Sequence, residues 1–237
     1  MIVFLLQIHQ LPHELRKYRF MTDQNLVSFQ ISSDGKAINQ TLQVVEIEVH
    51  NNVSGVSQAR IVVLANDVSE VTDAPEFKVD RKIGIELGYD GKDQSVFNGV
   101  VTGQSLHIKS GQGVAYEVVC ESYDEVQVIP PDDISNENST LRLSYGDDIL
   151  SCSMHSDPNV SSQIMGGIGI VGNSQVVPGS IVSLKGLGET FNGNQYVSGV
   201  NHHVANGNWY TDVNIGLAEE SDPADDFSFE GQSELLD

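Results

Sequence analysis

Two stretches of the chain, far apart in the sequence, follow the same plan of strand, glycine-rich turn and second strand. They are residues 83–102, IGIELGYDGKDQSVFNGVVT, and residues 181–202, IVSLKGLGETFNGNQYVSGVNH. The second strands align Val96–Val100 with Tyr196–Val200, and each of these segments holds an aromatic residue and a Gly-Val pair. A chain with two related β-modules presents six similar faces when it forms a trimer, so the repeat makes a symmetry adaptor a candidate function.

The repeat extends to the turns and to a third strand. The corresponding turn glycines are Gly88 with Gly91 and Gly186 with Gly188. The third apolar strands are Tyr116–Cys120 in the first copy and Trp209–Ile215 in the second.

Short strands with period-two alternation dominate the remaining sequence. In Leu42–His50, for example, this period turns Glu46, Glu48 and His50 away from the apolar face. Further strands are expected at Val27–Ile31, Ala59–Leu64, Ile83–Tyr89, Val96–His107, Val114–Cys120, Leu141–Tyr145, Ile149–Met154 and Gly166–Gly172, and a polar loop at residues 66–80. The fold class predicted is mainly β, with two related β-barrel modules.

The domain boundaries follow from changes in composition. Residues 1–22 form an N-terminal extension, which is either the product of an upstream start codon or an arm that docks on a neighbour. The expected units that follow are a first module at 23–124, a linker at 125–140, a second, possibly incomplete module at 141–217, and an acidic linker at 218–237.

The charge of the chain excludes some classes of partner. Twelve basic against 33 acidic residues give a net charge of -21. Nucleic acid and anionic membrane surfaces both require basic patches, so neither is an expected partner. The apolar run at the N-terminus is too short for a transmembrane helix, and its basic residues follow the run, which is the wrong order for a signal peptide.

No constellation of residues indicates catalysis, a cofactor or a metal. Strand residues follow the glycine clusters at 166–169 and 186–188, whereas a phosphate loop requires a helix there. His202 and His203 are adjacent, so in a strand they point to opposite faces. Cys120 and Cys152 lack the spacing of a zinc site or disulfide framework and are expected to be reduced thiols. The chain is therefore predicted not to be an enzyme.

Several segments, taken in order, resemble the hub part of VgrG-like spike proteins, the late-control-D relatives of contractile phage tails and type VI secretion. These are residues 27–63, residues 83–111, YEVVCESYD at 116–124, LRLSYGDDIL at 141–150, and VVPGSIVSLKGLGETFNGNQYVSGVNHHVANGNWYTDVNIGL at 176–217. The resemblance implies a homotrimer in which three chains form a pseudo-sixfold ring. Such a ring is a baseplate hub that joins the hexameric inner tube to the trimeric spike.

The same resemblance implies partners and a location. The partners are inner tube or tube-initiator proteins, a spike or needle, and other baseplate subunits. The hub is assembled in the bacterial cytoplasm and is extracellular after particle release.

The sequence departs from the hub pattern at two junctions. Less sequence than in the compared family members stands near residues 124–126 and 157–160, and the acidic tail follows Leu217 where the family continues into an OB-like domain and a needle. The chain is either a short member or a hub with segments and spike missing.

Five residues are predicted to be architectural. Gly99 and Gly199 are expected in paired strands, Phe97 and Tyr196 packing beside them, and Trp209 anchoring the last strand. The alternative function is a β-sandwich carbohydrate-binding or adhesion module, which requires exposed aromatic side chains on one sheet face. A hydrolase on a β scaffold is the third possibility, although no nucleophile constellation supports it.

Overall fold

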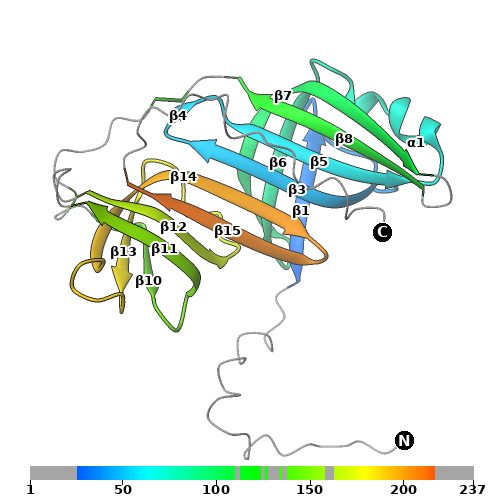
Figure 1. Cartoon of the computed structure of the whole chain (residues 1–237). Coiled ribbons are helices and arrows are strands. Elements are labelled where there is room, and N and C mark those ends of the chain that lie inside the picture. The colour runs from blue at the N-terminus through cyan, green and yellow to red at the C-terminus, as the bar shows by residue number, and fades with distance from the viewer. Residues whose placement is uncertain are drawn as a thin grey trace, which may run out of the picture.

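The structure, a computed structural model, describes residues 26–109, 113–123, 126–127, 134, 138–157 and 163–216. The chain is mainly β, as the alternation predicts, and one large sheet carries most of its strands (Figure 1). The expected terminal extensions, most of the linker and the short junctions near 124–126 and 157–160 lie outside the described residues, apart from a few positions. Within the described part, no helix is long and apolar enough to cross a membrane.

The strands fall into two modules with the same internal order. The first module contains β1 (Val27–Ser33), β3 (Gln43–Asn52), β5 (Gln58–Ala65), β6 (Lys82–Tyr89), β7 (Lys92–Lys109) and β8 (Gly113–Ser122). The second contains β10 (Leu141–Ser144), β11 (Ile149–Asp157), β12 (Gln163–Val171), β13 (Ile181–Lys185), β14 (Gly193–Ala205) and β15 (Asn208–Ile215). Three two-residue strands, β2 (Lys36–Ala37), β4 (Ser54–Gly55) and β9 (Val126–Gln127), complete the set.

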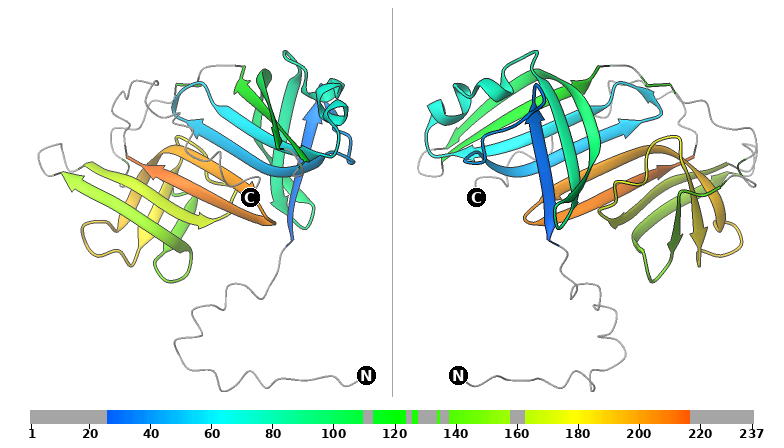
Figure 2. Two further views of the ribbon diagram at one scale, coloured as in Figure 1. Left: turned by 45° about the vertical axis from the view of Figure 1, so that its right-hand side comes forward. Right: turned by 180° about the vertical axis from the view of Figure 1, so that it is seen from behind.

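Hydrogen-bonded neighbours in the first module run β1-β6-β7-β8-β5-β3, and in the second β10-β13-β14-β15-β12-β11. Taken in chain order, each strand of one module thus has a counterpart at the same place in the other. Both views of Figure 2 show the β14–β15 hairpin, in orange, beside the blue strands of the first module. The direction of one strand pair differs between the modules: β1 is antiparallel to β6, whereas β10 is parallel to β13. The duplication seen in the sequence is therefore a duplication of topology.

The two modules are strongly curved sheets in which the end strands do not pair. Among the described residues, no ladder joins β1 to β3, and a single isolated bridge, Tyr145 with Ile149, lies between the ends of β10 and β11. The expected barrel closure is thus not provided by strand ladders within the described part of the chain.

The residue-by-residue correspondence of the two hairpins is wrong. Ile83 lies opposite Gly99 in the first hairpin, whereas Ile181 lies opposite Tyr196 in the second. The first hairpin closes through a two-residue turn, Asp90-Gly91, in which both residues have positive φ, and the second closes through the loop 186–192. The longer loop shifts the pairing, so the turn glycines expected to correspond do not occupy equivalent positions.

The segment 66–80, expected to be a loop, contains helix α1 (Val68–Thr72) and a 3-10 turn (Pro75–Phe77). Asp67 is the N-cap of α1, and its side chain accepts a hydrogen bond from the Ser69 backbone N–H. Val71 and Phe77 are fully buried in the first module. A single helical turn is too short to leave a periodic pattern in the sequence, which explains the wrong prediction.

Two hydrophobic cores lie under the two modules. The first includes Ile47, Ile61, Phe77, Ile85 and Phe97, and the second includes Leu143, Ile168, Leu184, Val197 and Val213. Val204 of β14 and Trp209 of β15 belong to the second module in sequence but pack in the first core. The hairpin β14–β15 therefore physically connects the two modules.

Replacing Gly172 with alanine is expected to cost about 3 kcal/mol of unfolding free energy, because a side chain there overpacks a closed core. An added Cβ would lie 2.0 Å from Cδ2 of Trp209. The matched control is Gly167→Ala in β12, where the nearest atom to a new Cβ lies at 3.9 Å. Urea unfolding of both variants would check this, and equal midpoints for the two would contradict the packing described.

Candidate functional site: the junction between the modules

Strand β14 joins the modules by pairing with two strands along one of its edges. Its first residues pair with β13 of its own module, from Gly193 to Tyr196. From Gly199 to Ala205 the same edge pairs with β3 of the first module in an antiparallel ladder that ends at Glu46. Because β15 occupies the other edge, the sheet continues without interruption from one module into the other. We call the ladder between β14 and β3 the junction.

Two of the predicted glycines lie where strands approach closely. A Cβ on Gly199 would lie 2.6 Å from Oδ1 of Asn52, the residue that Gly199 faces across the junction. A Cβ on Gly99 would lie 2.1 Å from the backbone oxygen of Glu121 on β8. The backbone contact at Gly99 excludes a side chain, whereas a side chain at Gly199 would displace the Asn52 side chain; only Gly199 lies in the junction.

The two predicted aromatic residues lie in different environments. Phe97 is buried in the first core, next to Gly99. Tyr196 is buried in a small third cluster with Val53 and Ile181. Since Val53 directly follows β3 and Ile181 opens β13, this cluster seals the end of the junction where β14 changes partner. The structure does not bring the five predicted residues together in one site.

Trp209 contacts both modules. Its ring centroid lies 5.3 Å from that of Tyr89 on β6 and 5.7 Å from that of His202 on β14. Its side chain is 3% exposed, and Gly172 packs directly against the indole ring. Among the described residues the indole Nε1–H has no hydrogen-bond acceptor, so Trp209 contributes through packing. The sequence predicted that Trp209 anchors the last strand, but it gave no sign that Trp209 contacts the first core.

The outward face of the junction carries a network of ion pairs. Arg60 of β5 lies 3.0 Å from Glu48 and 3.4 Å from Glu46, both on β3, and 3.1 Å from Glu117 on β8. His203 of β14 hydrogen-bonds Glu46 at 3.1 Å across the junction. This hydrogen bond raises the pKa of His203 and, together with the charge of Arg60, lowers the pKa of Glu46.

The same network contains the best-placed metal-ligand set in the described residues. Ligand atoms of Glu46, Glu48 and His203 lie within 4.8 Å of one another. The guanidinium of Arg60, however, already contacts both carboxylates and supplies the positive charge that a metal would bring. We therefore describe the group as an ion-pair network that connects β3, β5 and β8 to β14.

The predicted opposition of the two adjacent histidines is confirmed. His202 is 3% exposed and faces the cores, while His203 lies half-exposed in the ion-pair network. His202 forms a hydrogen bond with Oγ1 of Thr211 at 3.0 Å. Burial lowers the pKa of His202 to about 4, so its imidazole is neutral at pH 7.

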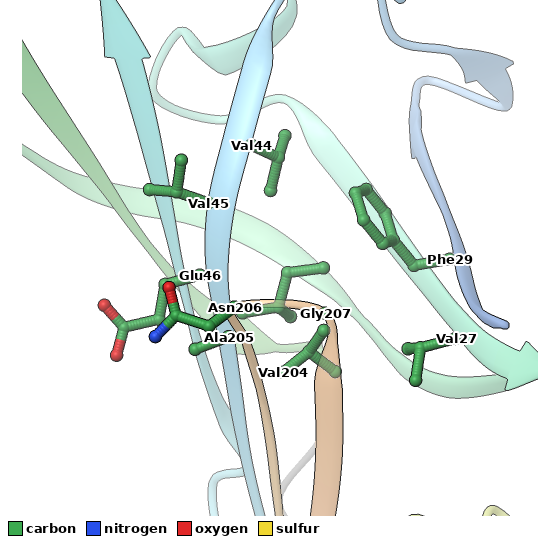
Figure 3. A pocket seen from close by; sticks show the side chains of 10 residues that line it. Val27, Phe29, Val44, Val45, Glu46, Val204, Ala205, Asn206 and Gly207 are labelled. Carbon is green, nitrogen blue, oxygen red and sulfur yellow. The ribbon is translucent and has the colours of Figure 1, made fainter. Parts of the chain in front are cut away.

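A groove of about 90 Å³ lies where the β14–β15 turn meets the first module (Figure 3). Phe29 and Val27 of β1 border one side of the groove, and Val44 of β3 borders the other. Val204 lines the end formed by the β14–β15 hairpin. A groove of this size holds a few water molecules or one side chain, so it is not a site for a substrate or cofactor.

Two strands present free edges that correspond to the two strands of the junction. Strand β7 is the counterpart of β14, and among the described residues only β8 pairs with it through a ladder beyond Val101, although the Gln104 side chain donates to the backbone oxygen of Phe77. Strand β11 is the counterpart of β3, and among the described residues only β12 pairs with it through a ladder. Leu106 and Ile108 on β7 are 40% and 62% exposed, and Leu150 on β11 is 54% exposed. Exposed edges with apolar side chains are characteristic of strands that pair with another chain.

One protein-family model matches the sequence. The model of a family described as the Alg8 N-terminal domain matches residues 23–129 and 158–206, which is more than half of the chain. No curated protein matches the sequence significantly.

Solved structures share the fold at low sequence identity. A tail protein from Neisseria meningitidis superposes with a TM-score of 0.55 at 8% identity, covering 80% of this chain and 96% of that one. The E. coli c3393 protein superposes with a TM-score of 0.56 at 12% identity, covering 81% of this chain and 77% of that one. That protein is a component of the type VI secretion system with structural similarity to T4 bacteriophage tail proteins gp27 and gp5.

Another similar structure is a Francisella PdpA-VgrG complex. It has a TM-score of 0.52 at 8% identity, over 89% of this chain and 62% of that one. At these identities the comparisons establish the fold, which this chain shares with phage tail and VgrG proteins. The expected resemblance to VgrG-like hubs is confirmed at this level.

Replacing Trp209 with alanine is expected to destabilise the contact between the modules by about 4 kcal/mol, as for other large-to-small changes of a buried tryptophan. Trp209→Phe is expected to cost much less, since no indole hydrogen bond is lost. The control is the neighbouring Tyr210→Ala, because Tyr210 is 44% exposed. Chemical unfolding followed by far-UV circular dichroism would rank the three, and a Tyr210→Ala effect as large as that of Trp209→Ala would refute this assignment.

Proposed function

The chain belongs to the Alg8 N-terminal domain family, and from its fold we propose that it is a structural hub of a contractile injection system. In this function the chain forms a homotrimer that joins a hexameric inner tube to a trimeric spike. The observation that carries the proposal is the junction, because a ring of such chains would need this contact within each chain and a similar one between chains. Two free strand edges on the same chain could form the contact between chains.

The junction shows how one module binds the next. In the junction, β3 of the first module pairs with β14 of the second. The counterpart of β3 in the second module is β11, the counterpart of β14 in the first module is β7, and both have a free edge. Pairing β11 of one chain with β7 of the next would repeat the same contact between chains. A head-to-tail contact of this kind generates a ring when its rotation closes. Three chains would then supply six modules related by similar contacts.

The apolar side chains near the free edge of β7 support the same contact. Leu106 and Ile108 lie opposite Tyr116 and Val114 of β8, on the side of the sheet that faces the core. Leu106 and Ile108 are not part of the buried first core, and their side chains are exposed. Val204 at the end of β14 occupies the comparable place in the second module and is buried in the first core. Leu106 and Ile108 would be buried in the same way against the second module of a neighbouring chain.

The hub function is structural and not enzymatic. Its partners would be inner tube or tube-initiator proteins, a spike or needle, and other baseplate subunits, and it would assemble in the bacterial cytoplasm and leave the cell with the particle. The net charge of -21 gives no reason to expect nucleic acid binding or membrane insertion. The alternative, a carbohydrate-binding module, would need exposed aromatic side chains on one sheet face, and the single tryptophan, Trp209, is buried.

The oligomeric state tests the ring. Light scattering of the full chain is expected to give three times the chain mass of 25.8 kDa. Ile108→Glu on β7 and Leu150→Lys on β11 are each expected to give monomers with unchanged circular dichroism, because a charge at a strand edge opposes pairing.

The matched control is Val56→Lys, an exposed apolar residue outside both free strands, which should leave the trimer intact. A wild-type chain that stays monomeric at high concentration would overturn the trimeric ring. A trimer that persists in both edge variants would instead exclude β7 and β11 as its contacts.

A further inference from the structure

His202 lies at the point where the two hydrophobic cores meet. Within β14, Val200 belongs to the second core and Val204 to the first, and His202 stands between them on the same side of the strand. Across the junction it faces Val49 of β3, and on the other edge it faces Thr211 of β15. Both of these neighbours are fully buried. An imidazole here is enclosed by apolar groups for as long as the junction is closed.

A chain of hydrogen bonds links this imidazole to the backbone of Asn173. The backbone N–H of Asn173 donates to Oγ1 of Thr211 at 3.0 Å. Nδ1 of His202 forms a hydrogen bond with the same Oγ1, also at 3.0 Å. Protonation of His202 would place a positive charge in this buried position, where the imidazole centroid lies 5.7 Å from that of Trp209.

The other face of the junction responds to pH in the opposite sense. His203 faces Glu46 and Glu48 of β3, Arg60 of β5 and Tyr210 of β15, with Glu117 of β8 beyond Arg60. Its pKa is raised, so its stabilising contribution is complete below its ordinary pKa of 6.5 and is lost as the pH rises through the raised value. The pKa of Glu46 is lowered, so its contribution persists until the pH falls through that lowered value.

We propose that the junction is an acid-released joint: it closes only over neutral His202, and protonation of His202 separates β14 from β3 while each module stays folded. The burial of His202 between the two cores, its hydrogen bond with Thr211 and the pairing of β14 with both β3 and β15 carry this proposal. It does not depend on the hub function.

The direction of the effect follows from the burial of His202. In an opened joint its pKa returns to the ordinary 6.5, whereas the closed joint holds it at about 4. The opened state therefore binds the proton more tightly, and the junction weakens as the pH falls from 6.5 toward 4. Over this range the equilibrium constant for opening is expected to rise on the order of 100-fold.

Two residues report on the joint and on the module separately. Trp209 is the single tryptophan of the chain and lies in the contact between modules, so its emission reports opening. Cys120 is fully buried in the first core, so its reaction with a pyridyl disulfide, a reagent that still reacts with thiols at acidic pH, reports unfolding of that module. The exposed Cys152 is removed as Cys152→Ser.

The experiment is a titration of the full-length Cys152→Ser chain from pH 8 to pH 3.5. The Trp209 emission is expected to shift to the red as the pH falls below 6, while Cys120 stays protected from the reagent. His202→Gln, whose amide oxygen can still accept from Thr211 but does not titrate, should abolish the shift. The adjacent control His203→Gln should move the transition to higher pH, because it removes the opposing contribution.

Three results would overturn the proposal. One is simultaneous exposure of Trp209 and Cys120, which would indicate global unfolding. Another is an unchanged transition in His202→Gln. If that variant does not fold, the His202 ring protons of the wild-type chain can be titrated by NMR, and a pKa near or above 6.5 would exclude His202 as the trigger.

Discussion

The ladder between β3 and β14 is the contact on which the rest of the structure depends. Without it β3 would be an exposed edge strand, and its backbone N–H and C=O groups would lack partners. With it, the two modules share one sheet, and Val204 and Trp209 reach the first core. The close approach of Gly199 to Asn52 and the cluster around Tyr196 both serve this ladder.

The two faces of the junction stabilise it by different means. On the inner face, burial of Trp209 and His202 favours a dry and neutral contact. On the outer face, Arg60 collects three carboxylates and leaves His203 to bond Glu46 across the ladder. The side chains of Arg60, Glu46 and Glu117 are largely buried, so removing one partner would leave an uncompensated buried charge. Both faces therefore stabilise the junction, and the outer face makes that stability depend on pH.

The sequence predicted the candidate site only in part, and the reason is visible in particular residues. Gly199 and Trp209 could be singled out because a glycine in a strand and a lone tryptophan are unusual in themselves. The partners of these residues could not be foreseen, since Asn52 and Tyr89 lie far away in the chain and pair with them only through the fold. The predicted correspondence between the two hairpins was wrong for a related reason. The length of the loop 186–192, and not the glycine pattern, sets which residues pair in the second hairpin.

The sequence alone determined that this protein is built of strands, that its plan is repeated, and that its surface is strongly acidic. These properties are local or additive: alternation decides which face a side chain occupies, and charge is a sum over residues. The tertiary structure alone decided that β14 pairs with β3, that Trp209 packs in the first core, and that β7 and β11 keep free edges within the described part of the chain. Strand pairing over long separations depends on which edges the whole chain leaves open, and no local pattern encodes that choice.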